Sequence, residues 1–132
     1  MPEQSLRGCR ILIVEDEYLL ADDLSYALSE AGAQVLGPIA SVEDAQTFIA
    51  GGDPIDAAVL DVNLRGDLIF PVAEALQDRG VPFAFATGYD QWALPTRFAD
   101  VPRVEKPFKS HKVAAVLGPL LTACSNDALQ RP

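Results

Sequence analysis

Five polar residues stand out because each follows an apolar run and because together they could act on phosphorus. Glu15 and Asp16 follow the first run, Asp61 follows a central one, and Thr87 and Lys106 follow two later ones. Three carboxylates held together repel one another unless cations neutralise them, and their hard oxygen atoms suit Mg2+. The lysine would add a second cation and the threonine a hydroxyl donor. Such a set could surround an anionic nucleophile that attacks a phosphorus atom.

These residues would meet only if the apolar runs are neighbouring strands of one parallel sheet. Short apolar runs of the kind found in strands covered on both faces span residues 10–14, 34–38, 56–60, 83–86 and 101–105. Apolar residues at helical spacing predict intervening helices over 18–31, from 42 to the glycines at 51 and 52, over 68–79 and from Ser110 onward. Alternating strands and helices predict an α/β fold with a doubly wound parallel sheet. If its first strand is central, Glu15, Asp16 and Asp61 converge at the switch point.

Prolines limit two of the helical connections. In the segment 89–100, Leu94-Pro95 opposes an α conformation at Leu94, and the apolar residues lack a 3.6-residue period. We therefore expect this segment to be short, irregular or mobile instead of forming a regular fourth helix. Gly118-Pro119 should likewise kink or shorten the last helix.

The composition is that of a single globular domain. The chain has 132 residues, of which 49% are hydrophobic, enough for a core without metal or disulfide staples. Its formal net charge of −9 argues against nucleic acid or an anionic membrane as a partner, because phosphate binding needs clustered Lys and Arg. No apolar run is long enough to cross a membrane, and residues 1–8 lack the core of a signal peptide. We expect a cytoplasmic protein with a flexible segment at 1–9, one domain at 10–122 and a flexible tail at 123–132.

Four motifs give the chain a family resemblance. They are Ile-Leu-Ile-Val-Glu-Asp-Glu at 11–17, Val-Leu-Asp-Val-Asn-Leu at 59–64, Ala-Thr-Gly at 86–88 and Glu-Lys-Pro-Phe at 105–108. In this order and spacing they resemble the receiver domain of two-component response regulators. The resemblance implies a flavodoxin-like (CheY-like) fold with five parallel strands in the order 2-1-3-4-5. The stretch 83–89 also resembles the FAT-GUY subgroup of α-proteobacterial single-domain receivers, named for a Phe-Ala-Thr-Gly-aromatic-Tyr signature, although here the tyrosine directly follows the glycine.

The resemblance implies a phosphoacceptor and a set of metal ligands. Asp61 would accept the phosphoryl group and would also contact the metal. Asp16 would bind Mg2+ directly, Glu15 would do so through water, and the backbone carbonyl of Asn63 would complete the protein ligands.

It also implies residues that recognise the phosphoryl group. Thr87 would hydrogen-bond a phosphoryl oxygen, and Lys106 would pair with the phosphoryl group or with free Asp61. The bond from Lys106 to Pro107 would be the cis peptide of the family.

The chain departs from the family pattern at its expected switch. Typical receivers carry an aromatic residue three positions before the lysine, and here that position is Arg103. Tyr89, two residues after Thr87, is the candidate replacement. Output could then work by ordering the segment 89–100 instead of rotating a formed helix.

These inferences favour a single-domain response regulator of a phosphorelay. It would take a phosphoryl group from a histidine kinase or a histidine phosphotransfer protein, and it would catalyse only its own phosphorylation and dephosphorylation. It would then signal through a protein partner or act as a phosphate sink. One alternative is a pseudo-receiver that binds partners without phosphorylation. Another is a haloacid-dehalogenase-like phosphohydrolase, but that family places a second Asp where this chain has Asn63.

Overall fold

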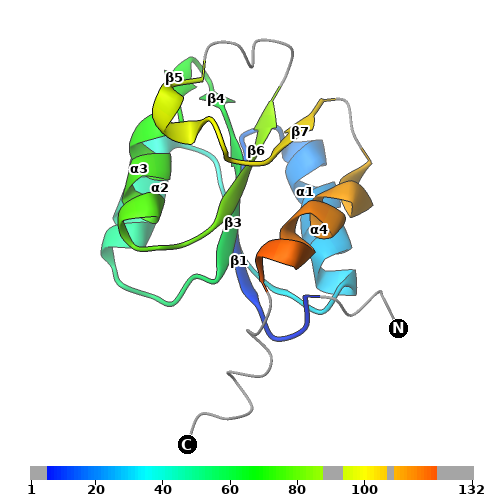
Figure 1. Ribbon diagram of the computed structural model, residues 1–132. Coiled ribbons are helices and arrows are strands. Elements are labelled where there is room, and N and C mark those ends of the chain that lie inside the picture. The colour runs from blue at the N-terminus through cyan, green and yellow to red at the C-terminus, as the bar shows by residue number, and fades with distance from the viewer. Residues whose placement is uncertain (1–5, 88–93, 107–108, 122–132) are drawn as a thin grey trace, which may run out of the picture.

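A five-stranded parallel sheet forms the centre of the molecule (Figure 1). The computed structural model describes residues 6–87, 94–106 and 109–121. The sheet has the order β2-β1-β3-β6-β7, built from β1 (Arg10–Val14), β2 (Gln34–Ile39), β3 (Ala57–Asp61), β6 (Phe83–Thr87) and β7 (Arg103–Glu105). These are the first to fifth strands expected from the sequence, so the predicted order 2-1-3-4-5 is confirmed.

Helices cover both faces of this sheet (Figure 1). On one side lie α1 (Tyr18–Glu30) and α4 (Ser110–Leu117), and on the other lie α2 (Val42–Ala50) and α3 (Phe70–Asp78). Within the described part of the chain, no helix is both long and apolar enough to cross a membrane. The arrangement is the doubly wound α/β fold expected from the alternation of strands and helices.

Local sequence signals account for several helix ends. The side chain of Ser41 accepts a hydrogen bond from the Asp44 N–H at 3.1 Å, which caps the start of α2. Pro71 lies in the first turn of α3, where its missing N–H costs no helical hydrogen bond. The predicted shortening of the last helix is confirmed, because α4 gives way to the 3-10 turn η4 (Gly118–Leu120).

Alternating side chains of β1 divide the core into two layers. Leu12 and Val14 face the layer under α2 and α3, whereas Ile11 and Ile13 face the layer under α1 and α4. All five residues of β3 are buried, including Asp61 at its last position. The central strand therefore holds this aspartate at the end of a rigid, doubly covered element.

The described part of the connection between β6 and β7 contains one 3-10 turn, η3 (Thr96–Phe98), and no α-helix. Phe98 is fully buried; its ring stacks on Phe70 at 5.6 Å and meets Phe85 edge-on at 5.6 Å. This geometry agrees with the irregular fourth connection expected for 89–100, of which residues 88–93 lie outside the described part of the chain.

One element was not expected from the sequence. The short strands β4 (Asn63–Leu64) and β5 (Asp67–Leu68) form an antiparallel hairpin directly after β3. The predicted start of the next helix at residue 68 is therefore wrong, because α3 begins only at Phe70. The hairpin rises beside the carboxyl ends of the strands (Figure 1).

Residues 6–9, within the segment expected to be flexible, pack against the domain. Leu6 is fully buried, and its N–H donates a hydrogen bond to the carbonyl of Ala31 at 2.9 Å. Leu6 and Cys9 add to the core layer beneath α1 and α4, whereas Arg7 and Gly8 between them are exposed.

Candidate functional site

Strand register brings the predicted acidic residues to one edge of the sheet. Val14 of β1 pairs with Leu60 of β3, so the next residues along these strands, Glu15 and Asp61, are neighbours. Asp16 follows at the start of the loop into α1. Parallel strands deliver their carboxyl ends to the same edge, which is where open α/β sheets bind ligands.

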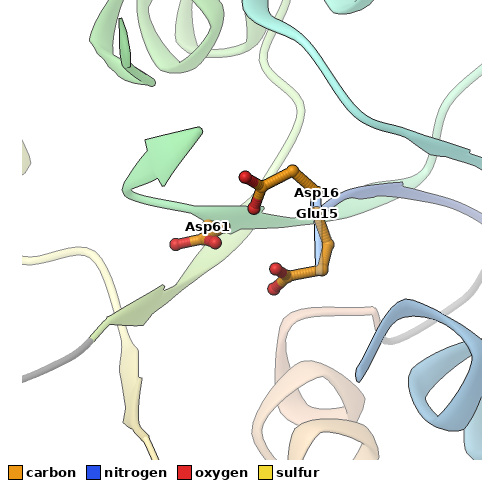
Figure 2. Close-up of side chains that lie close together, drawn as sticks. All are labelled: Glu15, Asp16 and Asp61. Atoms are coloured by element: carbon orange, nitrogen blue, oxygen red, sulfur yellow. The ribbon is translucent and has the colours of Figure 1, made fainter. Parts of the chain in front are cut away.

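The three carboxylates form one cluster. Figure 2 shows Glu15, Asp16 and Asp61 with their carboxylates turned to the same side of the sheet edge. One carboxylate oxygen from each residue lies within 4.8 Å of the other two. Glu15 and Asp61 are buried, and Asp16 is half-buried. The predicted convergence of these residues is what the structure shows.

Lys106, the residue directly after β7, is the cation that faces this cluster. Its Nζ lies 3.1 Å from Asp61 Oδ2 and 3.5 Å from Glu15 Oε1. A longer ion pair of 4.0 Å joins Lys106 to Glu17, at the residue before α1. The ammonium of Lys106 therefore contacts free Asp61, the pairing that the family resemblance implied, and also Glu15.

Burial and charge change the proton affinity of two of these groups. Burial first, and then the neighbouring Asp61 carboxylate, raise the pKa of Glu15 to about 8. Burial alone would lower the pKa of Lys106, but the carboxylates around it, Asp61 foremost, outweigh this effect and raise that pKa. Without a bound cation, Glu15 therefore holds a proton at neutral pH, and Lys106 stays charged.

Asn63 secures both Asp61 and the hairpin that follows it. The Asn63 N–H lies 3.3 Å from Asp61 Oδ1 and donates a hydrogen bond to it. The side-chain oxygen of Asn63 accepts a hydrogen bond from the Gly66 N–H at 2.8 Å. Both oxygens of Asp61 thus have a donor, one from the backbone and the other from Lys106.

Sequence reasoning missed a second cation at this site. Arg65, at the tip of the hairpin, places Nε 3.9 Å from Asp16 Oδ2. Its side chain is 69% exposed. The signal that could have found it was the Arg65-Gly66 turn, but two-residue strands are too short for periodicity to reveal a hairpin.

The remaining predicted site residues are described only in part. Thr87 is the last residue of β6 and pairs with Glu105 in the sheet, which puts its backbone at the same edge as Asp61. Tyr89 and Pro107 lie outside the described residues, so the switch aromatic and the cis peptide before Pro107 stay predictions. Arg103, at the usual aromatic position, directs Nη2 to the Ala99 carbonyl at 3.5 Å.

The donor set fits a hard divalent cation. It consists of carboxylate oxygens from three residues, of which two are buried. Among the described residues, Glu15 Oε1 is a buried side-chain oxygen that accepts no hydrogen bond, although the Lys106 ammonium lies 3.5 Å away. Clustered carboxylates in a partly closed site are the oxygen ligands that Mg2+ takes in proteins.

Comparisons with known proteins agree with this fold. No model of a known protein family matches the sequence. The sensory transduction protein LytT of Bacillus anthracis is 34% identical over 112 residues, which are 82% of this chain. The match covers 45% of LytT, so the chain spans about half the length of the curated relatives it matches.

Solved structures extend the likeness. SdrG from Sphingomonas melonis Fr1 is 44% identical, with a TM-score of 0.74 over 86% of this chain and 97% of that one. The BeF3-activated conformation of SdrG matches with a TM-score of 0.70 and 42% identity, over 92% of this chain and 100% of that one. A response regulator receiver protein from Sinorhizobium medicae WSM419 is 27% identical, with a TM-score of 0.75 over 90% of this chain and 98% of that one. The chain belongs to the receiver domains of response regulators.

Proposed function

We propose that this receiver is a single-domain response regulator of a phosphorelay, phosphorylated on Asp61 with bound Mg2+. The observation that carries the proposal is the pairing of Asp61 with Lys106 at 3.1 Å beside Glu15 and Asp16. An acceptor carboxylate, a fixed ammonium and a cluster of oxygen ligands are the parts that phosphoryl transfer to an aspartate requires.

Asp61 would act as the nucleophile. A lone pair on one carboxylate oxygen attacks the phosphorus of phosphohistidine, and an O–P bond forms. The P–N bond breaks, its electron pair remains on the imidazole nitrogen, and that nitrogen then takes up a proton. Asn63 and Lys106 limit the rotation of the Asp61 carboxylate, so little reorientation is needed before attack.

Positive charge around the nucleophile supports the transition state. Lys106 would pair with a phosphoryl oxygen as negative charge develops there. Thr87, at the end of the neighbouring strand, is proposed to donate its hydroxyl to another phosphoryl oxygen. A magnesium ion held by Asp16, Asp61, the Asn63 carbonyl and, through water, Glu15 would supply further charge neutralisation.

The flow of signal follows from this chemistry. The phosphoryl donor would be a histidine kinase or a histidine phosphotransfer protein, and the output would be a change in binding to a protein partner or removal of phosphoryl groups from the relay. The protein would catalyse only its own phosphorylation and dephosphorylation. The net charge of −9 supports a protein partner over nucleic acid, and we propose that the protein is cytoplasmic.

SdrG supports the single-domain interpretation and the proposed activation. The likeness spans 97% of the SdrG chain in one structure, and another structure shows SdrG in a BeF3-activated conformation. Membership of the FAT-GUY subgroup is proposed on the Phe-Ala-Thr-Gly run and on this similarity.

Mass spectrometry tests the proposal. The intact protein is incubated with acetyl phosphate and Mg2+ and then weighed, in parallel with Asp61→Asn. A gain of one phosphoryl group that Asp61→Asn does not show supports phosphorylation at this residue. An unmodified wild-type protein would favour the pseudo-receiver, and steady turnover of a generic phosphate ester would favour the phosphohydrolase.

A further inference from the structure

Arg65 is held beside the acidic cluster by an unusual backbone conformation. It forms a two-residue turn with Gly66, and the two residues have φ values of +53° and +92°. Positive φ at both central positions is the pattern of the type I′ hairpin turn, which favours Asn-Gly because most side chains resist it. Among the described residues, Arg65 is the one non-glycine residue with positive φ.

Such backbone strain suggests a function for the residue that bears it. The turn brings Arg65 back over the end of β1, where it forms an ion pair with Asp16 at 3.9 Å. The arginine side chain is mostly exposed, so it gains little stability from this pair. Stabilisation of the fold therefore does not explain the placement of this charge.

The two cationic side chains at the site, Lys106 and Arg65, form ion pairs with different acidic residues. Lys106 pairs with Asp61, Glu15 and Glu17, whereas Arg65 pairs with Asp16. Asp16 is the acid for which we propose direct metal coordination. A divalent ion that binds there must separate Asp16 from its present partner, and it must do so against the charge of the nearby guanidinium.

We propose that Arg65 competes with the divalent cation for Asp16 and so raises the Mg2+ concentration at which this receiver becomes loaded. The inference rests on the proposed function because it assumes the metal site. Arg65 acts through Asp16 and is therefore a positioning residue. The hairpin keeps the guanidinium of Arg65 near the metal site even after its ion pair with Asp16 has broken. Phosphorylation itself is not needed to observe the effect.

Titration calorimetry of the unphosphorylated full chain with Mg2+ tests this competition. Arg65→Gln should lower the Kd for Mg2+ by about two- to tenfold at low ionic strength, the range expected from loss of one exposed ion pair and of one nearby positive charge. The difference from wild type should shrink at high salt, because exposed charges are screened there. Arg65→Lys, which keeps the charge, should bind Mg2+ with nearly the wild-type Kd.

Two further variants separate charge from conformation. Arg7→Gln removes the same charge from an exposed position before β1, at the opposite edge of the sheet, and should leave the Kd for Mg2+ unchanged. Arg65→Asn suits positive φ better than Arg65→Gln does, so equal Kd values for the two would show that charge is responsible.

The outcomes also separate this inference from the function on which it rests. A wild-type protein that binds no Mg2+ at millimolar concentrations would overturn both. Mg2+ binding that is unchanged or weaker in Arg65→Gln would overturn the competition alone and leave Asp61 as the acceptor.

Discussion

Lys106 Nζ lies 3.1 Å from Asp61 Oδ2, although 45 residues separate them in the chain. The pair joins the end of the central strand β3 to the residue that follows β7, across the intervening strand β6. A contact of this length at a buried carboxylate places a positive charge where phosphoryl oxygens would develop negative charge.

Replacing Lys106 with methionine should slow phosphorylation of Asp61. The substitution keeps an apolar stem of similar length but removes the charge, so we expect the initial rate with acetyl phosphate and Mg2+ to fall on the order of tenfold to a hundredfold. The rate is measured by intact mass over time. Lys112→Met, at an exposed position of α4, is the matched control and should react like wild type. An unaltered rate in Lys106→Met would exclude a role for this ammonium in the transfer.

The stability of the metal-free protein should fall as the pH rises from about 5 to above 8. Burial and Asp61 raise the pKa of Glu15 to about 8, so between its ordinary value and 8 the folded state holds a proton that the unfolded state has lost. Stability rises with pH only where the unfolded state binds more protons, so here the sign is negative. Urea unfolding in EDTA at several pH values measures this slope.

Glu15→Gln should flatten that pH dependence, because the amide cannot lose the proton. Glu43→Gln, on the exposed side of α2, should keep the wild-type slope and controls for the loss of one carboxylate. Equal slopes in wild type and Glu15→Gln would show that Glu15 titrates normally in the folded protein.

Binding of Mg2+ at pH 7 should release protons. The cation favours the ionised form of Glu15, which burial and Asp61 keep protonated in its absence. Calorimetry in buffers of different ionisation enthalpy counts the protons released, and the Kd for Mg2+ should fall as the pH rises toward 8. We expect Glu15→Gln to release fewer protons at pH 7. Proton release as large as that of wild type would assign the linkage to another group.

Phe98 should be a main source of stability for the connection before β7. It is fully buried among aromatic rings, so Phe98→Ala should lower the free energy of unfolding by about 3–5 kcal/mol. Arg97→Ala removes exposed contacts to Gln77 and Asp78 on α3 and a cation–π contact of 5.7 Å with the Phe98 ring, but no buried aromatic packing, and should cost about 1 kcal/mol or less. Urea unfolding compares the two, and similar losses would contradict the assigned importance of the aromatic contacts.

The pattern of apolar residues was enough to predict the strands, whereas the strand order that makes the acids converge was implied by the family resemblance. Continuous apolar runs revealed the buried strands, and the residue after each run revealed what it delivers to the sheet edge. The β4–β5 hairpin was not predicted because its strands have two residues each, too few to show a repeating pattern of apolar residues. The raised pKa of Glu15 could not be predicted for another reason, because a glutamate within an acidic run gives no sign that folding will bury it.

The partner of Asp16 could not be predicted either, because it depends on how one turn folds back over another strand. Arg65 shares no motif with Asp16, and only the backbone conformation of the hairpin tip brings the two together. Pairings of this kind require coordinates.

The opposite edge of the sheet offers a position at which a label or tag can be attached. The turn at residues 51–54 lies before the amino end of β3, and its residues are exposed. A fluorophore or affinity tag inserted there would be separated from Asp61 by the length of the central strand. Surface-captured or labelled protein could then report partner binding without obstructing the end at which the chemistry takes place.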